Sequence, residues 1–119
     1  MKSEILIMVI VLISLCAQPF PGQITTTQQN LSRTIPANIQ DAVNSCREQC
    51  FLLKNLTDTS NGPCILNEIS NFQGWVCDMV HEPRQEIDNL PTNQCPNYRD
   101  GFATNFIELD TNCNYLRSQ

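Results

Sequence analysis

Cysteine is the residue that most restricts what this chain can fold into, because the 119-residue sequence contains seven of them. Such a content is typical of proteins that leave the reducing cytosol and form disulfides. Six of the seven follow the N-terminal region with the spacing C-x3-C-x13-C-x12-C-x17-C-x17-C. We expect all six to be disulfide-bonded, although the spacing leaves many pairings open: Cys46, Cys50, Cys64, Cys77, Cys95 and Cys113.

Metal binding is the alternative role for these cysteines. Structural zinc sites take their ligands from closely spaced cysteine and histidine residues. This chain has no C-x2-C pair and a single histidine, His81, and the haem-attachment motif C-x-x-C-H is also absent from it. The spacing therefore favours disulfides over zinc, and we expect no metal and no cofactor.

The first two of these cysteines lie in a segment with helical periodicity, Ala37–Leu56. Apolar side chains recur there at steps of three and four residues, which places them on one stripe of a helix: Ile39, Val43, Cys46, Cys50 and Leu53. Cys46 and Cys50 are one turn apart and point in the same direction, so we do not expect a bond between them. Each should reach a partner elsewhere, and Cys77 and Cys113 are expected to accept one or both.

The N-terminus has the pattern of a secretory signal peptide. Lys2 precedes the apolar run Ile5–Cys16, which is shorter than the about 20 residues that a membrane-spanning helix needs. We expect cleavage after Cys16 or Ala17, so that residues 1–17 form the signal peptide. Lipidation at Cys16 ranks second and a retained membrane anchor third. The predicted localisation is therefore secreted or on the outer cell surface.

The remainder divides into a spacer and one domain. Residues 18–36 are predicted to be a flexible polar spacer, because Gln23–Thr34 has almost no charge and few apolar side chains. Residues 37–119 form a disulfide-stabilised globular domain whose small core would gain roughly 3–4 kcal/mol from each bridge. Asn30 and Asn55 match the glycosylation pattern N-x-[ST].

Further segments complete the predicted fold. Pro63–Ile69 is expected to form a short second helix, Gly74–Val80 alternates as a strand, and Thr104–Leu109 with Cys113–Arg117 has a hairpin pattern. His81–Pro96 contains three prolines and is expected to be a long irregular loop. The predicted fold class is α+β: an N-terminal helix and a short second helix packed on a small three-stranded antiparallel sheet.

The best candidates for a functional site lie at the end of the predicted strand and in the loop after it: Asp78, His81, Arg84 and Asp88. Asp78 is close enough in sequence to hydrogen-bond His81 and fix its tautomer for base catalysis, and Arg84 can bind an anion. The structural alternative is that His81 caps the strand end and that Arg84 pairs with Asp88 to hold the loop.

Composition and missing motifs narrow the possible functions. The net charge of −5 argues against nucleic acid and anionic membranes as partners. The chain contains no G-x-S-x-G, no H-E-x-x-H and no glycine-rich phosphate loop. If all six cysteines are oxidised, none is left as a nucleophile. We therefore assign no catalytic residues, and we favour a protein that is not an enzyme.

Four stretches carry a family resemblance: SNGPCI (60–65), GWVCDMVHEPRQ (74–85), DNLPTNQCPNYRDG (88–101) and FIELDTNCNYLR (106–117). Together they resemble a family of small secreted six-cysteine proteins from archaea and bacteria whose role is uncharacterised. The likeness covers roughly Ser45–Arg117. It implies an exported, compact domain and brings no activity, cofactor or catalytic residue with it.

The sequence thus predicts a secreted or cell-surface binding module. Its partner would be an extracellular protein or surface component, contacted by the loop His81–Gln94, which is long and mixes arginine, proline and carboxylates. Two alternatives stay open. One is a small extracellular hydrolase that uses His81 with Asp78, and the other is an inhibitor of extracellular proteases that presents Pro83–Pro91.

Overall fold

The computed structural model describes residues 33–119, and the structural statements below concern these residues. The predicted signal peptide, most of the predicted spacer and the motif at Asn30 lie outside them. In chain order the elements are η1 (Ala37–Ile39), α1 (Gln40–Leu56), β1 (Cys64–Leu66), β2 (Trp75–Met79), η2 (Glu86–Asn89), α2 (Pro96–Arg99), β3 (Asn105–Leu109) and β4 (Tyr115–Ser118). The domain begins earlier than residue 37, the predicted start. Ile35 lies against the core, and Arg33 forms an ion pair with Glu82 at 3.2 Å.

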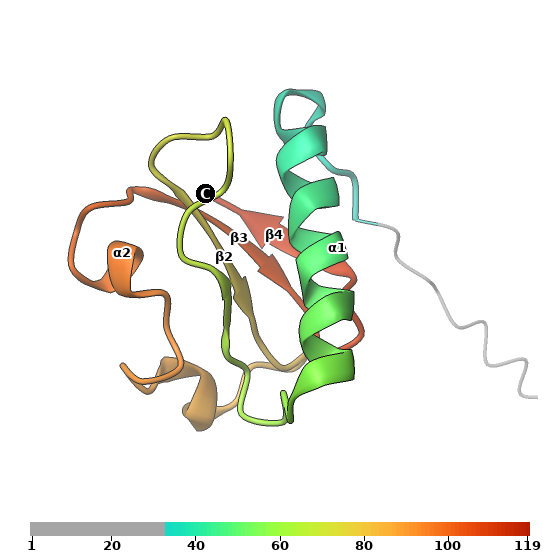
Figure 1. Ribbon diagram of the computed structural model, residues 1–119, viewed down its shortest axis with the longest axis vertical. Coiled ribbons are helices and arrows are strands. Elements are labelled where there is room, and N and C mark those ends of the chain that lie inside the picture. Colours follow the sequence, from blue (N-terminus) through green and yellow to red (C-terminus); the bar gives the residue numbers. More distant parts are fainter. Residues whose placement is uncertain (1–32) are drawn as a thin grey trace, which may run out of the picture. The chain divides into compact units, whose positions relative to one another are not determined.

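The four strands form one mixed sheet in the order β1-β2-β3-β4 (Figure 1). β1 is antiparallel to β2 and β3 is antiparallel to β4, whereas β2 and β3 are parallel. The α+β class and the C-terminal hairpin are confirmed, but the expected three-stranded antiparallel sheet is wrong. Parallel neighbours need a crossover of about a dozen residues or more, and residues 80–104 provide it.

The expected second helix over Pro63–Ile69 is also wrong, because Cys64–Leu66 forms the edge strand β1. Cys64 pairs with Asp78 of β2, and Leu66 pairs with Cys77. A short apolar run does not reveal its structure by periodicity alone, so the available edge of β2 decides the outcome here.

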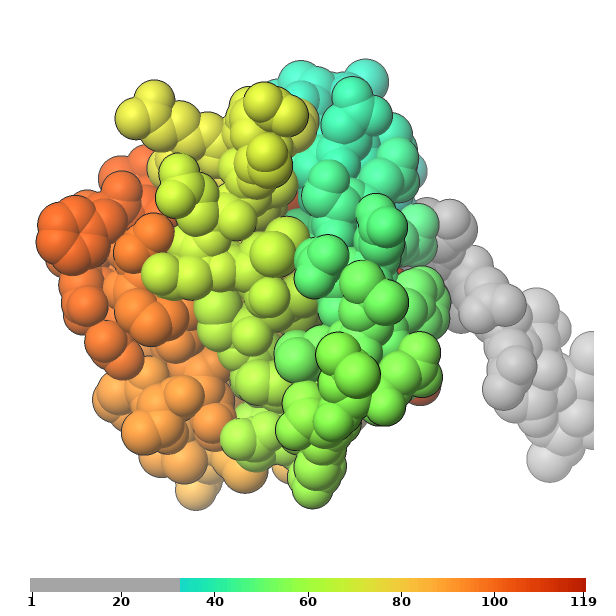
Figure 2. Space-filling model, in the orientation of Figure 1, coloured from blue at the N-terminus to red at the C-terminus, as the bar shows by residue number. Residues whose placement is uncertain are grey.

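The helix α1 covers one face of the sheet. Its buried side chains are Ala42, Val43, Cys46 and Cys50, and Ile39 is buried just before it, which confirms the predicted apolar stripe except for the half-buried Leu53. α1 and the edge strand β1, which follows it in the chain, lie side by side (Figure 2). None of the helices in residues 33–119 is long and apolar enough to cross a bilayer.

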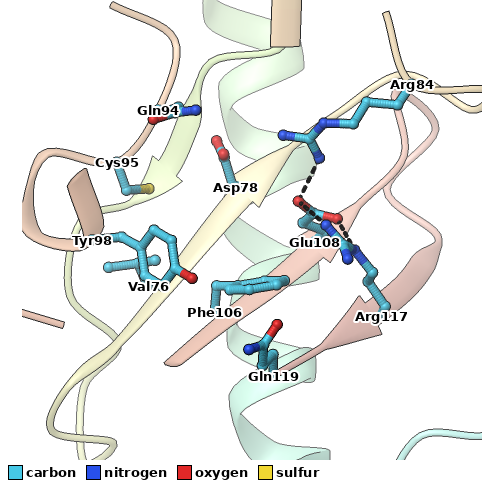
Figure 3. A pocket seen from close by; sticks show the side chains of 10 residues that line it. All are labelled: Val76, Asp78, Arg84, Gln94, Cys95, Tyr98, Phe106, Glu108, Arg117 and Gln119. Atoms are coloured by element: carbon cyan, nitrogen blue, oxygen red, sulfur yellow. Dashed lines mark hydrogen bonds and ion pairs between the residues drawn. The ribbon is translucent and has the colours of Figure 1, made fainter. Parts of the chain in front are cut away.

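Successive side chains of β2 point to opposite faces of the sheet, as its alternating sequence predicts. Cys77 and Met79 join the core beneath α1, whereas Val76 and Asp78 face the opposite side. Figure 3 shows this opposite side, with α1 behind the sheet. The crossover, residues 80–104, lies over it and contains η2 and α2, so the segment expected to be an irregular loop is partly helical.

Two disulfides join distant parts of the chain. Cys50–Cys113 links α1 to the turn before β4, and Cys64–Cys95 links β1 to the residue before α2. Because disulfides persist in oxidising surroundings, the two bridges indicate an oxidising environment for the domain.

The expectation that all six cysteines are bridged is met for four of them. Cys46 and Cys77 are unbonded and fully buried. Both belong to the core cluster beneath α1, where they fill space as small apolar side chains do.

Candidate functional site

A cleft of about 220 Å³ opens on the face of the sheet opposite α1 (Figure 3). The strands contribute Asp78, Phe106, Glu108 and Arg117 to its lining, and the crossover contributes Arg84 and Tyr98. The cleft therefore combines two carboxyl groups, two guanidinium groups and two aromatic rings. It is the place where the crossover segment meets the charged face of the sheet.

Glu108 is the electrostatic centre of this cleft. Its side chain is only 8% exposed, and it forms ion pairs with Arg84 and Arg117. Arg84 Nη1 lies 2.6 Å from Oε1, while the Arg117 guanidinium bonds both carboxylate oxygens. Arg117 also lies over the ring of Phe106, at 5.1 Å from the ring centre. Two cations thus neutralise one buried carboxylate.

Asp78 lies next to Glu108 but has no such neutralisation. The two residues are register partners on β2 and β3, so their side chains leave the sheet on the same face. Burial, together with the neighbouring Glu108 carboxylate, raises the pKa of Asp78 to about 7. The oxygen Oδ1 of Asp78 is buried without a hydrogen-bond partner in the described part of the chain.

His81 is bound by Asp88, so the expected Asp78–His81 hydrogen bond is wrong. His81 Nδ1 lies 2.8 Å from Asp88 Oδ1, and Asp88 Oδ2 accepts the backbone N–H groups of His81 at 3.1 Å and Gln85 at 2.8 Å. Burial opposes the charge on Asp88, but these donors outweigh it and hold the pKa of Asp88 below its usual value. Asp88 is 1% exposed, so it fixes the start of the crossover from inside.

Arg84 connects the crossover to the sheet. The structural alternative paired it with Asp88, and Arg84 Nη2 does donate to the Asp88 carbonyl oxygen at 3.5 Å, but its ion-pair partner is Glu108 on β3. Its Nε also donates to Asn89 Oδ1 at 2.9 Å. Of the four predicted site residues, the structure places Asp78 and Arg84 in the cleft, His81 in a neighbouring hollow that Arg84 and Glu108 also line, and Asp88 beneath the surface.

Sequence reasoning missed the residues that contribute most to this site: Tyr98, Phe106, Glu108 and Arg117. One signal was present. In the run Phe106-Ile-Glu-Leu109, a glutamate alternates with apolar residues that fill the core, so it lies on the same face as Phe106. Arg117 faces it across the predicted hairpin, whereas Arg84 reaches it from the crossover, a segment that local patterns do not place.

Within residues 33–119, no group of three or more His, Cys, Asp or Glu side chains is arranged to hold a metal ion. Asn55, the second predicted glycosylation position, is exposed near the end of α1.

No family model, curated protein or solved structure matches this chain. The resemblance to small secreted six-cysteine proteins stays a prediction.

Proposed function

We propose that the chain is an exported binding module, secreted or held at the outer cell surface, that contacts an extracellular protein or surface component through this cleft. The N-terminal signal pattern and the two disulfides support export. The crossover between β2 and β3 forms the rim of the binding surface, in place of the simple loop His81–Gln94 expected from sequence.

The observation that carries the proposal is the unpartnered oxygen of Asp78. A buried polar atom without a hydrogen bond costs roughly 1–3 kcal/mol, and folded proteins contain few of them. A partner that displaces the side chains covering this oxygen and brings an N–H or O–H donor to it recovers this energy. The polar contact then adds affinity and selects for a donor at that position.

The surroundings of Asp78 are held rigidly, which favours binding. Cys95 lines the cleft and is tied to β1 by its disulfide, while Arg84 and Arg117 are held by Glu108. A preformed site loses less conformational entropy on binding than a flexible one.

The test uses immobilised full chain, produced in an oxidising compartment, and the extracellular proteins and surface fraction of the organism that makes it. Wild type is compared with Asp78→Asn and Arg84→Ala. The control is Glu48→Gln, an exposed change on α1 at the other face of the sheet. Quantitative mass spectrometry identifies each retained component.

We expect a component that wild type and Glu48→Gln retain equally and that the two cleft variants retain at least tenfold less. Equal retention by all four proteins would show that the cleft is not the contact surface. Circular dichroism melting curves establish that each variant is folded at the temperature of the experiment.

A hydrolase is the second candidate, favoured by one observation. A carboxyl group with a pKa of about 7 beside a second carboxylate is poised for general acid or base catalysis at neutral pH. This version assigns the proton transfer to Asp78 and gives no role to His81. Chromogenic ester, peptide and glycoside substrates test it: turnover must vanish in Asp78→Asn and persist in His81→Ala.

A further inference from the structure

Two buried cysteines are the feature that the proposed function does not use. Cys46 lies on α1 and Cys77 on β2, both are fully buried, and neither forms a disulfide in the structure. They belong to the same core cluster. The Cys46 thiol lies within side-chain hydrogen-bonding range of Cys77.

The fold holds these two side chains toward each other from both directions. Cys50 follows Cys46 by one helical turn on the same face of α1, and its disulfide to Cys113 fixes that face against the sheet. On β2, Val76 and Asp78 point into the cleft, so Cys77 must point toward α1.

The compartment supplies the remaining condition. The four other cysteines of the domain are oxidised, and a pair of adjoining thiols in the same oxidising surroundings is a substrate for thiol–disulfide exchange. We propose that Cys46 and Cys77 form a third disulfide, which joins α1 to the central strand β2 through the core.

The oxidant is an external disulfide of the compartment, carried by a small thiol compound or an oxidoreductase. The thiolate of one cysteine attacks it, which forms a mixed disulfide and releases one thiol. The second cysteine then attacks the protein-bound sulfur of that mixed disulfide and releases the second thiol. Two cysteine thiols lose two protons and two electrons in total, and the external disulfide receives them as two thiols.

The position of the pair also dictates when the bond forms. Burial raises the pKa of Cys77 well above its usual value, and the adjacent Cys46 raises it further. A thiol that is rarely ionised and has no access to solvent reacts slowly. The bridge therefore closes while α1 is still docking on the sheet, and afterwards it is shielded from reductants.

Peptide mapping of the wild-type chain tests the proposal without any substitution. The full chain is exported to an oxidising compartment, denatured without reductant, and treated with N-ethylmaleimide at acidic pH to block free thiols. Trypsin cuts after Arg47 and so separates Cys46 from Cys50, and a glutamate-specific protease cuts after Glu68 and so separates Cys64 from Cys77.

The expected product is one linked pair of fragments that carries Cys46 and Cys77, together with the pairs Cys50–Cys113 and Cys64–Cys95. The intact domain then weighs six hydrogen atoms less than its reduced form. Recovery of Cys46 and Cys77 as maleimide adducts, with a loss of only four hydrogen atoms, overturns the proposal. Linkage of either residue to another cysteine overturns it as well.

Discussion

Asp78 and Glu108 are register partners on the parallel strands β2 and β3, and both are buried on the face of the sheet opposite α1. Glu108 is bound by Arg84 and Arg117, whereas Asp78 keeps one oxygen without a partner. Because Asp78 is buried and lies beside the Glu108 carboxylate, its pKa rises to about 7. The protonation of Asp78 therefore affects both the free energy of unfolding of the domain and the charge inside its cleft.

The raised pKa of Asp78 predicts that its contribution to stability falls as the pH rises. Between about pH 4 and pH 7 the folded chain holds a proton on Asp78 that the unfolded chain has released, so unfolding becomes easier across this window. The limit for this one group is roughly 4 kcal/mol. Asp78→Asn should therefore melt several degrees higher than wild type at pH 8 and at nearly the same temperature at pH 3, below both pKa values of the group.

The comparison is made by thermal melting over a pH series, with Glu48→Gln as the exposed control. A parallel shift of Asp78→Asn at both pH values would mean that the carboxyl group is not the titrating group.

Glu108→Gln should lower the pKa of Asp78, because it removes the neighbouring negative charge. Burial, the larger cause, persists, so the pKa should stay above the ordinary aspartate value. Removing the shared carboxylate also leaves Arg84 and Arg117 without their partner. Since both arginines are partly exposed, we expect a loss of only about 1–3 kcal/mol in the free energy of unfolding. Carboxyl carbon NMR titration measures the pKa, and an unchanged Asp78 would contradict the coupling.

Gly62→Ala should destabilise the fold strongly. Gly62 has φ +67°, and an added Cβ would lie 2.6 Å from Asp88 Oδ1 and 2.9 Å from the carbonyl oxygen of Met79. Both atoms are held in place, so a loss of about 2–4 kcal/mol is expected in urea unfolding. Gly101→Ala is the matched control: its φ is +82° but nothing lies within 4 Å, so only about 1 kcal/mol should be lost.

Asp88→Asn should destabilise the start of the crossover, and it should make the free energy of unfolding depend less on pH in the acid range. The Asp88 carboxylate accepts two backbone N–H groups and contacts His81. Its lowered pKa means that this stabilisation is complete above about pH 4 and is lost as the pH falls through the lower, folded value. We expect the variant to lose about 2 kcal/mol at pH 7 and less at pH 2. An equal loss at both pH values would show that the charge is irrelevant.

The sequence predicts those parts of the fold that depend on local periodicity. The stripe on α1 and the alternation of β2 each bury one side of a single element, so the pattern is visible in that element alone. The C-terminal hairpin follows from the same local reasoning, and its strands β3 and β4 pair as expected.

The remaining features depend on residues far apart in the chain. β1 is a strand because the edge of β2 is free to pair with it, and the ion pair of Arg84 with Glu108 forms because the crossover returns over the sheet. His81 lies three residues from Asp78 in sequence, yet its partner is Asp88, which η2 turns back toward the strand end. No spacing rule for one element contains this information.

The parallel pairing of β2 with β3 has a consequence for how the protein can vary. These strands cannot meet until the intervening segment has been laid across the sheet, and the same segment supplies Arg84 and Tyr98. An insertion in this segment that reshapes the proposed binding surface therefore also lengthens the chain that must close before β2 and β3 can pair, and slows that closure.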